Sequence, residues 1–376
     1  MFKVLSLPGR GGPNPYVDLF YDALLPHGIE LVGKLTFNYE WLKSNSSTFD
    51  AIHLHWPELL WRNYRPASLR RLRTSTVPGS WRTANYLESR LSRYFNKKKI
   101  DWFAENVLFL KGQGKKILYT WHNLEPHENV SRIDFLGNEI LSEYADLIIF
   151  HSEWAETQCR QQYNIRAKTV VMPHGNYDGI YPAARNRDLV ARELGLDPGK
   201  PIVGCLGAIR DYKGIDIACE ALILLKGSSQ FLCAGKPRET FALDTLKNDI
   251  SKIKGAVLVP KMISDQEFSD FANLCDCLLL PYKQVTGSGA LLAALTLSRG
   301  VIASDFPYFR EVLKGVPNSG LLVEPNHPES LAAAIMTYLA VPSDVRNTAA
   351  RSLADKYKWA LVVKPVVEIL HPLIHP

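Results

Sequence analysis

Short apolar runs alternate with longer amphipathic stretches along the whole chain. Runs such as Lys3–Leu7, Ala51–His55 and Ile202–Leu206 have the length and the Val, Ile and Leu content of buried strands. Between such runs, stretches such as Pro15–Leu25 and Gly214–Leu225 repeat apolar residues at helical spacing. This alternation predicts βαβ units and parallel sheets.

Both halves of the chain contain strand and helix candidates in regular succession. Strands are expected at Lys3–Leu7, Ile29–Leu35, Ala51–His55, Lys116–Thr120, Leu147–Phe150, Thr169–Met172, Ile202–Leu206, Gln230–Cys233, Ala256–Leu258, Cys277–Leu280, Val301–Ala303 and Gly320–Val323. Helices are expected at Pro15–Leu25, Tyr86–Leu110, Arg132–Tyr144, Gly214–Leu225, Thr240–Ile253, Asp265–Leu274, Gly289–Leu297 and Pro328–Leu339. The pattern predicts two doubly wound α/β domains, each with a ligand crevice at the carboxyl ends of its strands.

The boundary between the two domains is expected in Pro173–Leu189, a polar segment punctuated by prolines and glycines. We assign residues 1–176 to the first domain and residues 177–355 to the second. The amphipathic tail, residues 356–376, is expected to pack back on the first domain. A length of 376 residues fits two domains.

Composition excludes several classes of protein. Hydrophobic residues make up 46% and charged residues 22%, which is ordinary for a globular protein and excludes bulk disorder. No apolar run approaches the roughly 18 residues that a membrane span needs. The amino terminus shows no signal-peptide pattern, and the six cysteines form no C-x-x-C pair. We therefore expect a cytoplasmic protein with buried free thiols.

The net charge of +6 is concentrated in one segment, residues 61–103. Between residues 62 and 99, eleven basic side chains face a single acid, Glu88, and aromatic residues lie among them. Basic side chains mixed with aromatics are typical of a surface that binds anionic membranes. A solvated helical face and a nucleic-acid surface are the alternatives, but no nucleic-acid motif accompanies the patch. We expect peripheral association with the inner face of the membrane and no nucleic-acid partner.

Two loops of the second domain are candidates for anion binding. Gly207 ends a buried strand, and Arg210 and Lys213 follow it just before a helix, an arrangement that suits a diphosphate. The sequence Thr-Gly-Ser-Gly at residues 286–289 exposes backbone N–H groups before another helix. Incidental loop charges and simple capping by Ser288 are the respective alternatives.

Polar clusters in the first domain close two strands that we expect to be neighbours. One cluster spans His53–Glu58 and the other Thr120–Glu128. Their carboxylates and imidazoles are the residue types that serve as general bases, and the spacing does not indicate a metal site. The loop after the first strand contains Gly11 and Gly12, which let a ligand approach the backbone. We expect Gly11, Gly12, Tyr16 and His55 on the acceptor side.

Five motifs together carry a resemblance to a known family. They are Met-Pro-His-Gly at 172–175, G-x-x-R-x-x-K-G at 207–214, Ala-Gly-Lys-Pro at 234–237, Val-Ile-Ala-Ser-Asp at 301–305 and Gly-Leu-Leu-Val-Glu-Pro at 320–325. In their order and spacing the chain resembles the GT-B glycosyltransferases, especially those of family four. The resemblance implies a GT-B fold of two Rossmann-like domains with a crevice between them.

The resemblance also implies roles for residues. His122 matches a position where the side chain approaches the donor sugar. Positions expected to bind a nucleotide-sugar are Gly207, Arg210, Lys213, Met262, Thr286, Gly287, Ser288 and Gly289. No cofactor and no metal are required, because Arg210 and Lys213 can neutralise a diphosphate.

The chain departs from the family at two positions. Family-four enzymes carry two glutamates around the helix that follows residue 289, and Val285 and Ala293 occupy those places here. Retention or inversion of the anomeric centre therefore stays open. The Thr-Gly-Ser-Gly variant resembles bacterial exopolysaccharide transferases, among which inverting enzymes occur.

We therefore expect a hexosyltransferase that moves a hexose from GDP-mannose or a UDP-hexose to a saccharide acceptor, which we expect to be lipid-linked. Glu58 and Glu128 are the candidate bases for the acceptor hydroxyl, and His122 completes the expected catalytic set. The missing glutamates leave one alternative, an inactive GT-B protein that binds a glycan or nucleotide. A nucleotide-sugar epimerase, which shares the two-domain architecture, is a second alternative.

Overall fold

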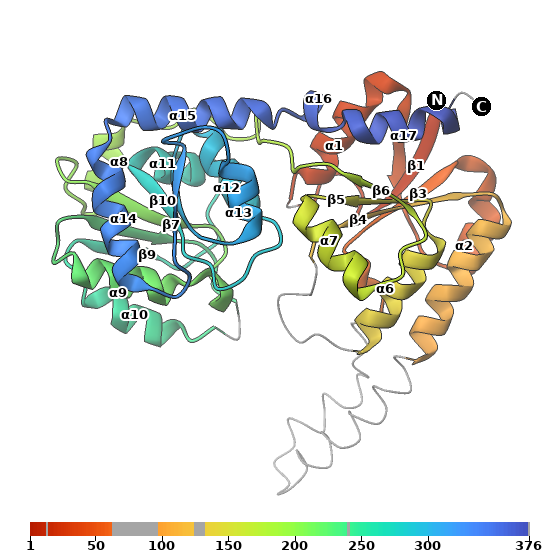
Figure 1. Ribbon diagram of the computed structural model, residues 1–376, viewed down its shortest axis with the longest axis horizontal. Coiled ribbons are helices and arrows are strands. Elements are labelled where there is room, and N and C mark those ends of the chain that lie inside the picture. The colour runs from red at the N-terminus through yellow and green to blue at the C-terminus, as the bar shows by residue number, and fades with distance from the viewer. Residues whose placement is uncertain (13, 62–96, 124–131, 239–240, 375–376) are drawn as a thin grey trace, which may run out of the picture. The chain divides into compact units, whose positions relative to one another are not determined.

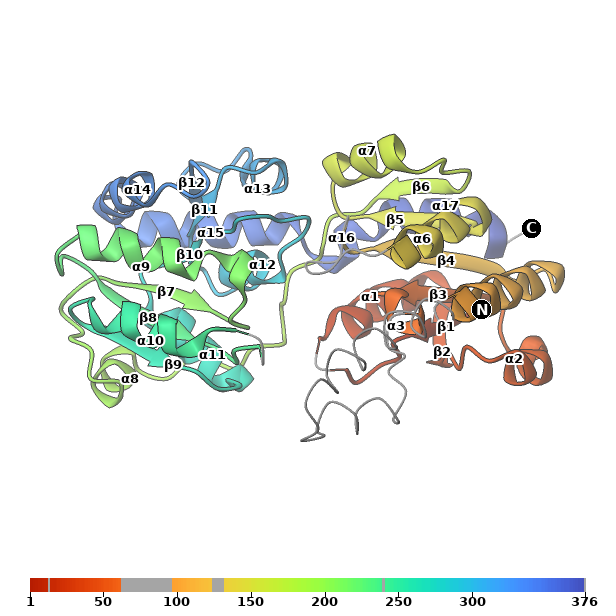
Figure 2. The same cartoon turned by 90° about the horizontal axis from the view of Figure 1, so that it is seen from below.

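The computed structural model describes the chain except for residues 13, 62–96, 124–131, 239–240 and 375–376 (Figure 1). The chain divides into two compact units. The first comprises residues 1–172 and 363–376, and the second comprises residues 173–362. Each unit contains a six-stranded parallel sheet with helices packed around it (Figures 1 and 2).

The sheet of the first unit has the order β2-β1-β3-β4-β5-β6. Its strands are β1 (Phe2–Leu7), β2 (Ile29–Lys34), β3 (Ala51–His55), β4 (Lys116–Trp121), β5 (Leu147–Phe150) and β6 (Lys168–Val171). Its helices are α1 (Tyr16–Leu24), α2 (Tyr39–Asn45), α3 (Glu58–Trp61), α6 (Arg132–Tyr144), α7 (Glu153–Gln162) and α17 (Lys364–Ile374), and residues 97–112 are also helical. The strand order reverses between β1 and β3, which is where doubly wound sheets open a crevice.

The sheet of the second unit has the order β12-β11-β10-β7-β8-β9. Its strands are β7 (Ile202–Leu206), β8 (Gln230–Ala234), β9 (Ala256–Val259), β10 (Cys277–Leu280), β11 (Val301–Ser304) and β12 (Gly320–Val323). Its helices are α8 (Arg187–Glu193), α9 (Ile215–Leu224), α10 (Leu243–Ser251), α11 (Asp265–Leu274), α12 (Gly289–Thr296), α13 (Pro307–Leu313), α14 (Pro328–Ala340), α15 (Ser343–Lys356) and α16 (Trp359–Val362). Here the order reverses between β7 and β10.

The cores explain why the apolar runs become strands. Every residue of β3, β7 and β8 is buried, as expected for parallel strands covered on both faces. The core of the first unit is rich in aromatic side chains, including Trp61 and Trp121, whereas that of the second is mainly aliphatic. All six cysteines are buried free thiols, as expected from the sequence. In the part of the chain that the structure describes, no helix is long and apolar enough to cross a membrane.

The predicted strands are all present, with ends that differ by a residue or two. The sequence missed short helices such as α2, α7 and α8, which begin at the capping side chains of Asn38, Ser152 and Asn186. These helices have only two or three turns, so their apolar periodicity is weak.

The boundary between the units lies after Met172, because the next residues bond to the second unit. Asn176 N–H donates to Tyr357 O at 2.7 Å, and Asn176 Nδ2 donates to Ala354 O at 3.1 Å. Trp359 Nε1 in turn donates to Asn176 O at 2.8 Å. Residues 173–176 and 356–362 therefore belong to the second unit, and the tail joins the first unit only from Val363. Within that unit, α17 contacts β6.

Candidate active site

The loop after β7 lies where the strand order of the second sheet reverses. Gly207 adopts a φ of 92°, and its N–H donates to Ala234 O at 2.9 Å. A Cβ on Gly235 would lie only 1.9 Å from Gly207 O. Because the ends of β7 and β8 approach this closely, only glycine fits, and bare backbone forms this part of the sheet edge.

Arg210 and Lys213 lie on this loop at the two ends of a single 3₁₀ turn, Asp211–Lys213. Among the residues that the structure describes, neither side chain forms an ion pair with a carboxylate. Arg210 Nη1 donates to Ile209 O at 3.2 Å, and Lys213 Nζ lies 5.8 Å from the ring centre of Tyr282. Burial lowers the pKa of Lys213. An ammonium that has lost water without gaining a carboxylate is well placed to bind an anion.

The Thr-Gly-Ser-Gly segment, residues 286–289, follows β10, the strand beside β7. Ser288 is 6% exposed, and its Oγ accepts a hydrogen bond from Leu291 N–H at 3.2 Å. Ser288 therefore caps α12, which is the simpler of the two roles that the sequence allowed. A Cβ on Gly289 would lie 2.5 Å from Tyr177 Oη, so this position requires glycine for packing. Backbone near Thr286 and Gly287 remains a candidate for binding the second phosphate.

Val285 and Ala293 occupy the two positions where the resembling family carries glutamates. Val285 is 5% exposed and Ala293 is 2% exposed. Both side chains are therefore part of the apolar interior, where an ionised carboxylate would be strongly disfavoured. At these positions the second unit has apolar side chains that pack in its core.

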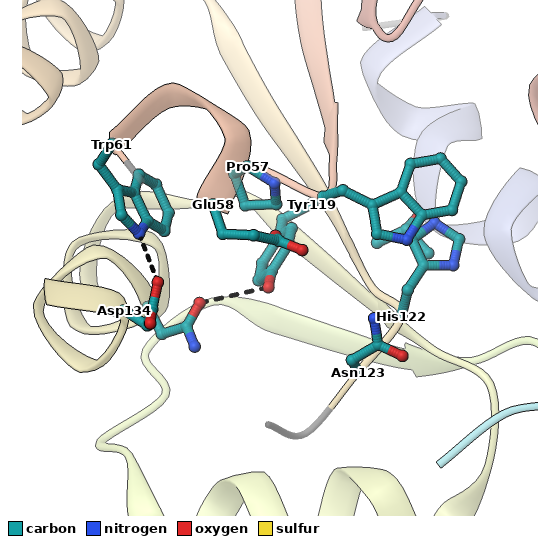
Figure 3. A pocket seen from close by; sticks show the side chains of 10 residues that line it. Pro57, Glu58, Trp61, Tyr119, His122, Asn123 and Asp134 are labelled. Atoms are coloured by element: carbon teal, nitrogen blue, oxygen red, sulfur yellow. Dashed lines mark hydrogen bonds between the residues drawn. The ribbon is translucent and has the colours of Figure 1, made fainter. Parts of the chain in front are cut away.

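A pocket in the first unit opens at the carboxyl ends of β3 and β4 (Figure 3). The space between its lining side chains is about 320 Å³ when the open solvent at its mouth is included. Its lining residues are Trp56, Pro57, Glu58, Trp61, Tyr119, Thr120, His122, Asn123, Asp134 and Asn138. The parallel register of β3 and β4 pairs His55 with Thr120, so the described parts of the two polar clusters predicted from the sequence lie side by side.

Glu58 is the first residue of α3, a short helix that is anchored at its other end. Trp61 Nε1 donates to Asp134 Oδ1 at 2.9 Å, and the Trp61 ring packs so tightly on Gly137 that a Cβ there would lie 2.4 Å from it. Figure 3 shows the Glu58 side chain lying beside Tyr119 within the pocket. Burial raises the pKa of Tyr119, and the charge of Glu58 raises it further.

His122 forms the wall of the pocket together with Trp56. The two rings stack with centres 4.2 Å apart and planes 13° apart. Behind His122 lie the fully buried His55 and Tyr16, and the edge of the Tyr16 ring contacts both imidazoles. Tyr16 and His55 thus support the pocket wall from within, whereas the sequence suggested that they face a ligand.

Other predicted residues lie elsewhere. Gly11 has a φ of 74° and its N–H donates to Asp18 at 3.1 Å, while Gly11 and Gly12 are both exposed. Met262 is 69% exposed after β9. Glu128 and most of the basic segment fall outside the described residues. Within the described ranges, no group of three or more His, Cys, Asp or Glu side chains is arranged to hold a metal ion.

Sequence reasoning missed several residues of the pocket. Tyr119 and Asn138 lie outside the two polar clusters that the sequence indicated, and so does His151, which lies next to His122. Since β5 pairs with β4, a histidine directly after β5 is carried to the end of β4. The strand order would have been enough to place it.

Comparison with protein families and known proteins agrees with this geometry. Residues 200–340 match the family model of the glycosyl transferases group 1. The chain is 25% identical over 301 residues to the GDP-mannose:glycolipid 4-beta-D-mannosyltransferase of Xanthomonas campestris pv. campestris, which covers 77% of this chain and 69% of that protein.

Solved structures share the two-unit architecture. HepE from Anabaena, in complex with UDP and glucose, superposes with a TM-score of 0.71 at 14% identity, covering 99% of this chain and 100% of that one. Sucrose-phosphate synthase from Thermosynechococcus elongatus gives a TM-score of 0.68 at 17% identity, with 99% of each chain covered. At sequence identities this low, the structural similarity supports a shared fold and nothing more.

Proposed function

We propose that this chain, which has the GT-B fold and carries a glycosyl transferases group 1 domain in its second unit, transfers a hexose from a nucleotide-sugar to a saccharide acceptor. The GT-B fold class predicted from the sequence is confirmed by the solved structures, and the glycosyltransferase resemblance is supported by the family model over residues 200–340. The finer parts of the function, namely the donor, the acceptor, the stereochemistry and the membrane association, are proposals.

One observation carries the proposal: Arg210 and Lys213 have no described carboxylate partner at the strand-order reversal of the second sheet. A diphosphate brings two negative charges to two such cations. Glycosyl transfer expels this diphosphate, so cations that bind it more strongly as its charge develops lower the barrier. Because the two side chains can supply this stabilisation, the proposed reaction does not depend on a metal ion.

The pocket of the first unit supplies the rest of the proposed chemistry. Glu58 would accept the proton of the acceptor hydroxyl, while that oxygen attacks the anomeric carbon and the nucleoside diphosphate departs. Such a single displacement inverts the anomeric centre. Inversion is favoured by the apolar Val285 and Ala293, because neither family glutamate is present beside the donor. Glu128 remains the alternative base.

The relative from Xanthomonas indicates which substrates to test first. Its name describes transfer from GDP-mannose to a glycolipid. We propose GDP-mannose ahead of UDP-hexoses as the donor and a lipid-linked saccharide of exopolysaccharide assembly as the acceptor.

The decisive experiment incubates the purified protein with radiolabelled GDP-mannose or UDP-glucose and lipid-linked saccharides. Transfer of label to the lipid phase, with release of the nucleoside diphosphate, is expected. NMR of the product should show that the anomeric configuration is inverted relative to the donor. Nucleotide binding without turnover would favour an inactive binding protein, and interconversion of nucleotide-sugars without transfer would favour an epimerase.

Membrane association is proposed through the basic and aromatic segment, residues 61–103. Of the described part, Lys97 and Lys98 are exposed at the start of the helical residues 97–112. Sedimentation with liposomes of anionic and of neutral lipid at rising salt tests the proposal. Binding should require anionic lipid and weaken with salt, whereas binding indifferent to both would contradict it.

A further inference from the structure

Three histidines in the first unit form a continuous chain of hydrogen bonds. They come from the ends of three adjacent strands: His55 from β3, His122 after β4 and His151 after β5. His55 Nδ1 lies 3.1 Å from His122 Nε2, and His151 Nε2 lies 3.3 Å from His122 Nδ1. Each nitrogen of the His122 ring therefore faces the nitrogen of another imidazole.

A backbone carbonyl determines which nitrogen donates in each hydrogen bond of this series of histidines. His151 Nδ1 lies 2.9 Å from Met172 O, and because a carbonyl only accepts, His151 must carry its proton on Nδ1. With one proton on each ring, His151 Nε2 accepts from His122 Nδ1, and His122 Nε2 accepts from His55 Nδ1. The chain then ends on a bare lone pair at His55 Nε2.

A separate observation agrees with that end point. His55 is fully buried, and its Nε2 has no hydrogen-bond partner among the described residues. A buried N–H without an acceptor would be costly. Burial also holds the pKa of His55 well below its usual value, and the neighbouring histidines lower it further. An uncharged ring with the proton on Nδ1 fits both observations.

The consequence for His122 is that neither ring nitrogen is left for a substrate. What the pocket receives from this residue is ring surface, stacked on Trp56. Trp56 adopts a φ of 48°, a left-handed conformation that is rare for a bulky residue and costs energy. The strained tryptophan is stacked on the fixed histidine, so at the pocket wall one ring supports the other.

We propose that His55 and His151 are positioning residues, which fix His122 in one tautomer so that the stacked pair of Trp56 and His122 presents its outer ring face, here called the aromatic platform, to the face of a pyranose ring. The C–H groups on one face of a sugar pack on aromatic surface through dispersion and burial of apolar area. The proposal rests on the proposed function for the sugar, but the histidine chain itself does not depend on it. The platform contacts substrate, and the positioning residues act only through it.

The first test measures the tautomers directly. In full-length protein labelled with ¹⁵N-histidine, long-range ¹H–¹⁵N spectra distinguish Nδ1–H from Nε2–H rings, and single substitutions assign the signals. His55, His122 and His151 are all expected in the Nδ1–H form, which free histidine disfavours. An Nε2–H or doubly protonated ring at any of the three positions at pH 7.5 would overturn the proposal.

The second test distinguishes a residue that fixes the His122 tautomer from one that only supports the fold. His151→Asn places an amide near Nδ1 and keeps a donor for Met172 O, but removes the acceptor for His122. His151→Gln places an amide oxygen near Nε2 and keeps that acceptor. His151→Asn should release the His122 tautomer and raise the KM for the sugar substrate about tenfold with a smaller change in kcat, and His151→Gln should restore both. Equal effects of the two variants would contradict positioning.

The third test identifies the sugar without requiring turnover. GDP-mannose and UDP-glucose serve as donor probes, and methyl mannoside and methyl glucoside serve as acceptor probes. A donor probe or an acceptor probe that shifts the His122 and Trp56 ring signals assigns the platform to that substrate. If none of the four shifts these signals in wild-type protein, the platform is refuted even where transfer activity is present.

Discussion

At the carboxyl end of β7 in the second unit, Arg210 and Lys213 carry charge that no described carboxylate neutralises. At the carboxyl ends of β3, β4 and β5 in the first unit, polar rings instead bond to one another, as His55, His122 and His151 do. The region in the second unit offers cations without a described anion, whereas the imidazoles in the first unit bond to one another and leave only His55 Nε2 without a described partner. The difference indicates separate tasks, with the second unit suited to a charged diphosphate and the first unit suited to an uncharged sugar.

The largest expected effect falls on the first unit. Glu58→Gln should lower kcat about 10²–10⁴-fold while nucleotide-sugar binding persists, because the amide cannot accept the proton of the hydroxyl. Steady-state transfer assays and calorimetry of donor binding measure the two quantities. Glu105→Gln, at an exposed position of the same unit, is the matched control. Full activity in Glu58→Gln with loss in Glu128→Gln would assign the base to Glu128.

A somewhat smaller effect is expected from the cations of the second unit. Lys213→Met should reduce kcat/KM roughly 10²–10³-fold, as the loss of one charge-stabilising donor does in other enzymes. The melting temperature should not fall, because burial already disfavours the charged ammonium. Arg192→Ala, exposed on α8, serves as the control for loss of a positive charge. If donor affinity is unchanged in Lys213→Met, the claim that the cations of the second unit bind the diphosphate is contradicted.

Restoring a family glutamate should damage the protein. Ala293→Glu places a carboxylate where the present side chain is 2% exposed, so the free energy of unfolding should fall by about 3 kcal/mol or more. Denaturant titration measures this change, and Ala293→Leu controls for side-chain volume. A stable Ala293→Glu variant with increased activity would show that the position still belongs to the donor site.

Acidification should weaken the first unit more than the second. Burial lowers the pKa of His53 to about 3 and that of His55 well below its usual value, whereas in the second unit it lowers that of His174 to about 4. These rings bind protons when unfolded but not when folded, so stability is complete above about pH 6.5 and falls as the pH drops below it. At pH 5.5 each of these buried imidazoles should lower the free energy of unfolding by roughly 1 kcal/mol.

Hydrogen exchange by mass spectrometry, corrected for intrinsic rates, compares the units at pH 7.5 and 5.5. Amides of β3 should lose more protection than amides of β7. The comparison fails if β7 loses more.

The two regions also differ in how far the sequence reveals them. The donor loop is local: a glycine with positive φ and two cations lie within residues 207–214, directly before α9, so its geometry can be inferred from spacing. The pocket of the first unit gathers residues from α3 and the turn before it, from β4 and the segment after it, and from α6. The chain of histidines adds His55 of β3, His151 after β5, and Met172. Spacing along the chain says nothing of such a set until the strand order is known. Ser288 shows that even a local motif can be ambiguous, because the same sequence suits both helix capping and phosphate binding.

The most direct test of the central claim is one assay of transfer to lipid-linked saccharide from GDP-mannose and UDP-glucose. It compares the wild-type protein with Lys213→Met and Glu58→Gln. Our account predicts transfer with an inverted anomeric centre in the wild type. It predicts weaker donor binding and a kcat/KM lower by roughly 10²–10³-fold in Lys213→Met, and undiminished donor binding with a kcat lower by about 10²–10⁴-fold in Glu58→Gln. Transfer that is equally fast in all three proteins, or retention of the donor's anomeric configuration in the product, would contradict it.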